Sequence, residues 1–247
     1  MKKYSILLLI FAFVVSAFAQ KKDDKPKETK TATVTISKDS TPMELAKAAL
    51  NAHGGDKLKS MKSLVIRGTA EISGSPTQTF PATFAMIFSG DKYRFEILAA
   101  PIINFKQVYD GEQTYSSLRG FTLPPLNRLG LPLLPKIEEK GFTVSALPDK
   151  LKKKFGFRIT SPEGYFTDFI IDEKTYFVKE YESSYEFNGT TATTSVAIDK
   201  YKEVNGIFVQ EKFAQRLEMG QITSYSDYKA KEITIDTEIA DDVFTMK

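Results

Sequence analysis

The sequence contains no cysteine, no tryptophan and a single histidine, His53. Without cysteine, no disulfide can hold the fold together, so its stability must come from buried apolar surface. One histidine and no thiol exclude the two-histidine and thiolate metal motifs and leave little for a transition-metal site. We expect no metal and no other cofactor. For His53 itself, the favoured interpretation is a charged residue at a helix end; a catalytic or ligand-binding imidazole is the alternative.

Motifs that organise catalysis are also missing. The sequence has no G-x-S-x-G, H-E-x-x-H or G-x-x-x-x-G-K-[ST] pattern, so no nucleophile, metal-bound water or phosphate loop is indicated. The carboxylate pairs Glu138-Glu139 and Asp241-Asp242 lie in polar stretches and are typical of solvated surface. We therefore expect no enzyme. The alternative is a hydrolase whose catalytic carboxylates come from distant strands, and such an enzyme would require a polar cleft.

Charge of one sign is not in excess. The formal net charge of the chain is +3, and it falls to +1 without residues 1–19, because Lys2 and Lys3 leave and no acidic residue does. A nearly neutral chain gives no electrostatic reason to bind nucleic acid, so no nucleic-acid partner is expected.

The first 40 residues look like targeting and linker sequence. Residues 1–19 combine two lysines, a short apolar run and Ala17-Phe18-Ala19, the pattern of a secretory signal peptide cleaved after Ala19. The next residue, Gln20, is not cysteine, so no lipid anchor is expected there; an uncleaved membrane anchor is the alternative. Residues 20–40 begin with a charged stretch and predict a disordered leader. We expect a periplasmic protein with one domain over residues 41–247.

That domain begins with a helix and continues as strands. Thr41, Pro42 and Glu44 form a capping box with proline at the first helical position, and Gly54-Gly55 ends the helix. From residue 63 onward the apolar period changes to two, with turns such as Asn205-Gly206, which predicts antiparallel hairpins. We expect roughly eleven strands, at residues 63–73, 80–88, 93–97, 105–109, 113–117, 155–160, 165–171, 175–187, 193–201, 207–213 and 222–229.

Residues 121–148 interrupt the strands. They contain five of the eleven prolines and many leucines, so they cannot form a regular central strand, yet they are too apolar for a solvated loop. A covering lid or short helical turns over an apolar face is expected. The candidate lid residues are Leu126, Leu129, Leu131, Leu133 and Leu134.

A curved sheet has a concave face that its own side chains, a helix or an apolar ligand must fill. The large residues expected on that face are Phe84, Met86, Phe88, Phe95, Ile97, Phe169 and Ile171. An open trough for acyl chains is favoured over a closed core, because the apolar mid-chain segment 121–148 could cover such a trough. Each buried methylene of a bound chain would contribute about 0.8 kcal/mol without any catalytic group. The alternative is a closed core, in which these side chains pack against one another and leave no room for a ligand.

Several short motifs occur in the order seen in one family. They are the first helix, strand 63–73, the hairpin at 84–95, residues 108–115 with the sequence VYDGEQTY, and residues 241–246 with the sequence DDVFTM. In this order the chain resembles the outer-membrane lipoprotein-sorting (LolA/LolB-like) superfamily, whose DDVFTM-like segment is a closing strand. The family's arginine–proline pair after the second long strand, whose arginine secures the lid, is replaced here by Asp91-Lys92, with Arg94 nearby.

The resemblance implies an unclosed antiparallel β-barrel with an N-terminal helix and a mid-chain lid, mainly β with some α. It also implies a periplasmic carrier that holds acyl chains of lipoproteins or phospholipids without catalysis. Envelope membrane proteins would act as donor and acceptor, and the carrier would be a monomer. The alternative is an envelope sensor or scaffold of the same fold that binds a protein partner.

Overall fold

The structure is a computed structural model that describes residues 37–246, apart from 38, 76–77, 102, 121 and 188. The expected signal peptide (1–19) and nearly all of the expected leader (20–40) lie outside these residues. Within the described part of the chain, no helix has the length and apolar character needed to cross a membrane.

Two helices open the described domain. Helix α1 (Pro42–Ala52) begins with the expected capping box, in which Thr41 N donates to Glu44 Oε2 at 2.7 Å and Glu44 N donates to Thr41 Oγ1 at 3.3 Å. Its buried face consists of leucines and alanines at helical spacing, so burial of this face fixes the helix on the sheet. Helix α2 (Asp56–Ser60) follows the two glycines directly.

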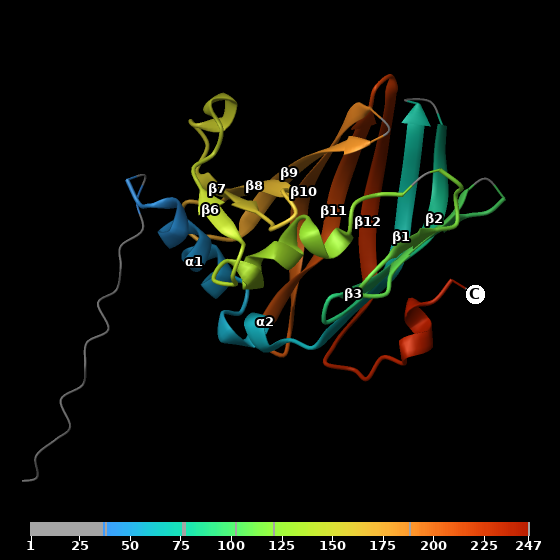
Figure 1. Cartoon of the computed structure of the whole chain (residues 1–247), viewed down its shortest axis with the longest axis horizontal. Helices are drawn as coiled ribbons and strands as arrows, with labels where there is room; N and C mark the ends of the chain where they lie inside the picture. Colours follow the sequence, from blue (N-terminus) through green and yellow to red (C-terminus); the bar gives the residue numbers. More distant parts are fainter. Residues whose placement is uncertain are drawn as a thin grey trace, which may run out of the picture. The chain divides into compact units, whose positions relative to one another are not determined.

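A single antiparallel sheet of twelve strands makes up most of the described residues (Figure 1). The bounds are β1 (Ser63–Ser75), β2 (Gln78–Ser89), β3 (Lys92–Ala99), β4 (Ile103–Tyr109), β5 (Thr114–Ser116), β6 (Thr143–Ser145), β7 (Gly156–Thr160), β8 (Phe166–Ile171), β9 (Val178–Phe187), β10 (Thr190–Val204), β11 (Ile207–Met219) and β12 (Ile222–Ile235). The expected class, mainly β with some α, is confirmed. The strand that sequence analysis missed is β6.

The order of the strands leaves the sheet unclosed. It runs β5-β4-β3-β2-β1-β12-β11-β10-β9-β8-β7-β6. The first and last strands in sequence, β1 and β12, pair with each other and join two meanders, β1–β5 and β6–β12. Strands β5 and β6 are neighbours in sequence but form the two opposite edges. The chain between them must therefore pass from one edge of the sheet to the other. The expectation of an unclosed antiparallel barrel is confirmed.

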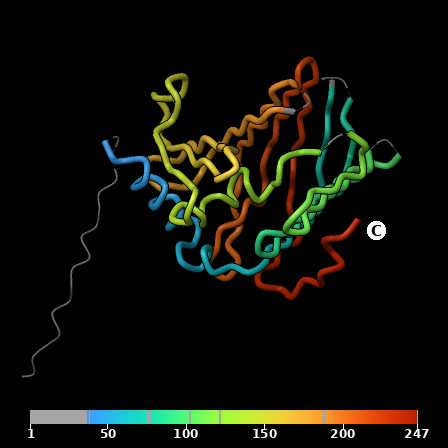
Figure 2. The backbone as a smooth tube through the Cα atoms, in the orientation of Figure 1, coloured from blue at the N-terminus to red at the C-terminus, as the bar shows by residue number. Residues whose placement is uncertain are grey.

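We call the described residues of this connection the crossing segment (residues 117–142), and Figure 2 shows it running from one half of the sheet to the other. It contains two short 3-10 helices, η1 (Leu126–Arg128) and η2 (Leu131–Lys136). Pro132 and Pro135 lie in η2, where they lack the amide hydrogen that a regular helix would need. The expectation of short helical turns is confirmed.

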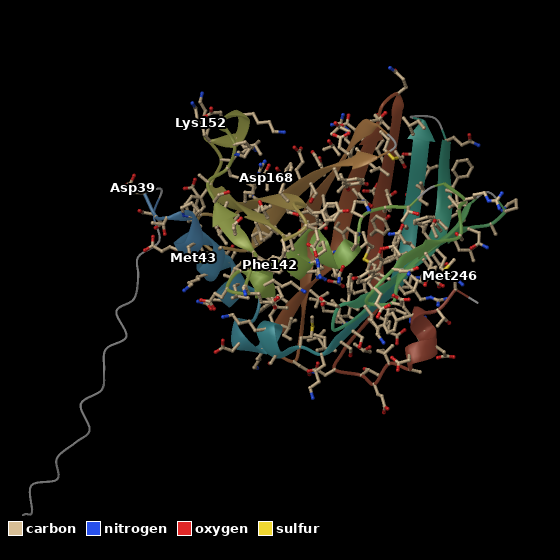
Figure 3. The ribbon with its side chains drawn as sticks, viewed as in Figure 1. Asp39, Met43, Phe142, Lys152, Asp168 and Met246 are labelled. Atoms are coloured by element: carbon tan, nitrogen blue, oxygen red, sulfur yellow. The ribbon has the colours of Figure 1, made fainter. Side chains whose placement is uncertain are left out.

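Two large apolar clusters fill most of the interior. The larger one gathers the inner faces of β1–β4 and β10–β12, and it includes Ile66, Phe95 and Phe213. The second lies between α1, η2 and strands β7–β9, and its members include Phe157 and Phe169. Figure 3 shows Met43 and Phe142, which pack against the second cluster, at the α1 end of the domain.

The C-terminal segment corrects one sequence-based expectation. Residues 241–244 form a 3-10 helix, η4 (Asp241–Phe244), and not a closing strand. Its Phe244 is buried against Val65 and Ile87, which point to the face of the sheet opposite to Ile66 and Met86. Arg94 Nη1 donates to the carbonyl of Val243 at 2.7 Å. Both edges of β1 are paired, with β2 and β12, and the last segment packs on the outer face of the sheet. Arg94 therefore holds this C-terminal segment and not the lid.

Candidate functional site: a cavity beneath the crossing segment

A cavity of about 790 Å³ lies between the inner face of the sheet and the crossing segment. Ligand pockets in proteins span about 300–1,000 Å³. The wall includes exposed residues, among them Leu118 and Glu139, so the cavity opens to solvent. Its apolar wall residues include Leu58, Met61, Ile66, Met86, Phe88, Phe95, Ile97, Phe105, Leu118, Leu123, Leu126, Leu129, Leu131, Leu134, Val196, Val209, Phe213 and Tyr228.

The structure divides the seven residues expected on the concave face into two groups. Met86, Phe88, Phe95 and Ile97 lie in the wall of the cavity. Phe84 belongs to the same apolar cluster as Phe95 and Ile97 but is absent from the wall. Its ring packs edge-on against the rings of Tyr228 and Phe213, with centroids 5.0 and 6.2 Å away.

Phe169 and Ile171 lie away from the cavity wall, in the cluster beneath α1. The ring of Phe169 stacks on that of Phe157 at a centroid distance of 5.3 Å and is fully buried. Periodicity placed these two residues on the inner face, but α1 and η2 cover that part of the sheet. Their position is that of packed core.

The lid leucines also divide. Leu126, Leu129, Leu131 and Leu134 line the cavity, whereas Leu133 does not. The side chains of Leu133 and Leu134 are fully buried in the cluster beneath α1. The crossing segment is therefore anchored in the core at η2, and Leu129, just before η2, is buried in a smaller cluster with Tyr185 and Ala192.

Strands β10–β12 supply wall residues that sequence analysis did not single out. Phe213 and Tyr228 stack with ring centroids 4.7 Å apart. Tyr228 Oη donates to Gln215 Oε1 at 3.1 Å, and Gln215 Nε2 donates to Thr194 Oγ1 at 2.9 Å. Burial raises the pKa of Tyr228 to about 12, so the hydroxyl stays protonated at neutral pH. For Phe213, the alternation of apolar residues along β11 was the available signal.

Charged side chains tie η1 and η2 to the β2–β3 turn. Lys136 Nζ lies 2.9 Å and Arg128 Nη1 lies 3.1 Å from the same oxygen, Oδ1 of Asp91. Asn127 Nδ2 donates to the backbone carbonyl of Asp91 at 2.5 Å. The hydrogen bond from Lys136, followed by that from Arg128, lowers the pKa of Asp91 despite partial burial. Asp91 is therefore ionised at neutral pH and holds both cations.

Arg128 also reaches the other half of the sheet. Its Nε lies 3.1 Å from Oε1 of Glu163, in the turn between β7 and β8. One side chain of the crossing segment thus links turns from the two halves of the unclosed sheet. Farther along, Glu138 pairs with Lys47 of α1 at 2.9 Å and with Lys59 of α2. Hydrogen bonds from these lysines lower the pKa of Glu138 to about 2.

His53 lies at the end of α1, on the cavity wall, and is almost completely buried. Its Nδ1 is 2.8 Å from the carbonyl oxygen of Ala49, and its Nε2 has no hydrogen-bond partner. The ring packs edge-on against Phe177 and Tyr201. Burial lowers its pKa to about 4, against 6.5 in the unfolded chain. The expected position at a helix end is confirmed, but the expected charge is wrong, because the buried imidazole is neutral at neutral pH.

Acid is expected to destabilise the fold through His53. Between pH 6.5 and about 4 the unfolded chain binds a proton at this site that the native protein does not bind. The free energy of unfolding should therefore fall by about 3 kcal/mol as the pH drops across this window, with no further His53 contribution below it. Urea unfolding at several pH values would measure the slope.

His53→Asn is the control for this pH dependence, since its amide can still donate to the carbonyl of Ala49 but cannot take up a proton. Carboxylates such as Asp91 titrate in both proteins, so the difference between the two slopes isolates His53. An equal pH slope in wild type and His53→Asn would show that the imidazole does not cause the effect.

Among the described residues, no three His, Cys, Asp or Glu side chains are grouped so that they could hold a metal ion. Three charged residues of the wall instead form ion pairs: Lys59 pairs with Glu138, and Lys136 pairs with Asp91. The arrangement can enclose an apolar chain and place a polar group near these ion pairs.

No protein-family model matches the sequence, and a search of curated proteins gave no match either. Among solved structures, a LolA superfamily protein from Nitrosomonas europaea is similar at a TM-score of 0.51 and 10% identity, over 84% of this chain and 98% of that one. A DUF1329 family protein from Desulfovibrio piger gives 0.48 at 9% identity, over 83% and 98% of the two chains. Identities this low compare folds only. With its unclosed sheet, N-terminal helix and covering segment, the chain has a LolA-like fold.

Proposed function

We propose that this protein is a non-catalytic carrier that holds the acyl chains of lipoproteins or lipids in the cavity beneath the crossing segment. The observation that carries the proposal is the cavity itself: about 790 Å³, open to solvent and lined mainly by aliphatic and aromatic side chains. A closed core would fill this volume with side chains, because apolar groups without packed neighbours lose van der Waals contacts.

The energetics of such a wall suit an acyl chain. Each methylene that leaves water for an apolar surface contributes about 0.8 kcal/mol, so a long chain binds tightly without any specific polar contact. A polar cleft built for hydrolysis would need ionised groups deep in the wall. Instead, the acidic wall residues Asp91 and Glu139 are exposed at the rim.

The proposed carrier works in the periplasm, exported by residues 1–19 and free of a lipid anchor because the sequence has no cysteine. In this setting it would move its ligand as a monomer between envelope membrane proteins that act as donor and acceptor. The LolA-like fold supports this assignment as analogy, since a fold alone does not fix a function.

Titration with a fluorescent fatty acid tests the proposal. We expect saturable enhancement of the fluorescence at about one probe per protein, and competition by an unlabelled fatty acid of the same length. Leu98→Ala, on the exposed outer side of β3, should bind equally well. Absence of saturable uptake would contradict the carrier and favour a sensor or scaffold that binds a protein partner, which crosslinking in the periplasm could then identify.

A further inference from the structure

The ion pairs at Asp91 are unequal in their access to water. The side chains of Arg128 and Lys136 are only 14% and 16% exposed, whereas that of Asp91 is 57% exposed. Two largely buried cations thus share one oxygen of a carboxylate that lies mostly in solvent. A buried cation that loses its anion is strongly destabilised, whereas an exposed carboxylate that turns into water loses little.

This cluster lies where the polar end of a ligand would be. Lys136, Asp91 and Asn127 are part of the cavity wall, next to the apolar side chains of Leu126 and Leu134. Arg128 lies outside the wall but contacts the same oxygen, Asp91 Oδ1, as Lys136 does. Asn127 is 2% exposed, and its Oδ1 has no hydrogen-bond partner. Buried carbonyl oxygens without a partner are rare in native proteins, so this atom marks a place where a donor is missing.

We propose that Arg128 and Lys136 form the binding site for the anionic headgroup, a carboxylate or phosphate, of an amphiphile whose chain lies in the cavity. Asp91 occupies this site in the empty protein, and the headgroup displaces it. The inference rests on the proposed function, because the apolar cavity must receive the chain.

The exchange keeps the charges balanced. The headgroup replaces one carboxylate by another anion, so Arg128 and Lys136 are never left unpaired, and the side chain of Asp91 moves into water. Arg128 keeps its second partner, Glu163, so the crossing segment stays attached to the β7–β8 turn. A hydroxyl or amide N–H of the headgroup can donate to Asn127 Oδ1. A neutral amphiphile of equal length gains the apolar contacts but cannot displace Asp91.

Three probes separate these contributions: dodecyl phosphate, the neutral monododecanoylglycerol, and inorganic phosphate alone. Their affinities are measured by competition with the fluorescent fatty acid and by calorimetry. In wild type we expect the dodecyl phosphate to bind more tightly than the neutral amphiphile, and inorganic phosphate alone to bind far more weakly than either.

Two variants test the site from opposite sides. Asp91→Asn removes the competing anion and should tighten binding of dodecyl phosphate by about three- to tenfold, while Lys136→Gln should weaken it by about the same factor. Neither should change the affinity for the neutral amphiphile by more than about twofold. Lys200→Gln, which breaks an exposed ion pair with Glu211 and lies outside the cavity wall, is the matched control.

The inference is overturned if Asp91→Asn weakens or leaves unchanged the binding of dodecyl phosphate, or if the variants shift both amphiphiles equally. Inorganic phosphate that binds as tightly as dodecyl phosphate would point to a free anion as the ligand and would also overturn it. If both amphiphiles bind without regard to these charges, the headgroup site fails and the carrier stands. If neither amphiphile binds, the proposed function itself fails.

Discussion

Replacement of Met86 by glutamate is expected to lower the affinity for a fluorescent fatty acid by at least about a hundredfold, or about 3 kcal/mol. Met86 lies on β2 in the cavity wall and is only partly buried. In the empty protein the new carboxylate can keep water, because the cavity opens to solvent, so the fold should survive. An acyl chain that enters must strip that water from the charge, and this desolvation opposes binding.

Met86→Leu is the matched control, because it conserves volume and apolar character; its affinity should stay within about threefold of wild type. Thermal unfolding of both variants should show folded protein. Wild-type affinity in Met86→Glu would contradict a chain in contact with this wall, and loss of the fold would show that Met86 is closed core.

Phe169→Ala should lower the free energy of unfolding by about 3–5 kcal/mol, among the largest effects of a single truncation in this protein. The ring of Phe169 is fully buried between β8, α1 and η2, stacked on Phe157. Its removal leaves a void that the surrounding helix and strands cannot close completely. Urea unfolding measures the loss.

Leu98→Ala supplies the comparison, since Leu98 is 46% exposed and should change the free energy of unfolding by at most about 0.5 kcal/mol. Under conditions where Phe169→Ala remains folded, its affinity for the fatty acid should match that of wild type. Lost affinity with unchanged stability would instead place Phe169 in the ligand site, as its position in the sequence pattern suggested.

Local signals in the sequence predicted most elements of the fold. The capping box at Thr41 and the turn at Asn205-Gly206 are both present, and the two turn residues have positive φ values of 54° and 82°. Strand β6 was missed because it has only three residues and follows a proline-rich stretch. The DDVFTM segment was misassigned because a short motif does not reveal which surface of the sheet it contacts. In the structure its Phe244 packs against Val65 and Ile87 on the outer face.

Periodicity identified the inner face of the sheet but could not separate wall from core. Phe95 and Phe169 follow the same alternation of apolar and polar residues. The cavity lies over Phe95, whereas α1 and η2 cover Phe169. What covers a strand depends on contacts distant in sequence. For the same reason the pairing of Asp91 with Arg128 and Lys136, 37 and 45 residues away, left no local signal.

Native mass spectrometry of the full chain, exported to a bacterial periplasm and purified without detergent, tests directly whether the cavity holds a ligand. We expect a population heavier than the polypeptide by the mass of an amphiphile, which activation in the gas phase releases, and which Met86→Glu lacks. Polypeptide mass alone, before and after incubation with extracted envelope lipids, would contradict the carrier.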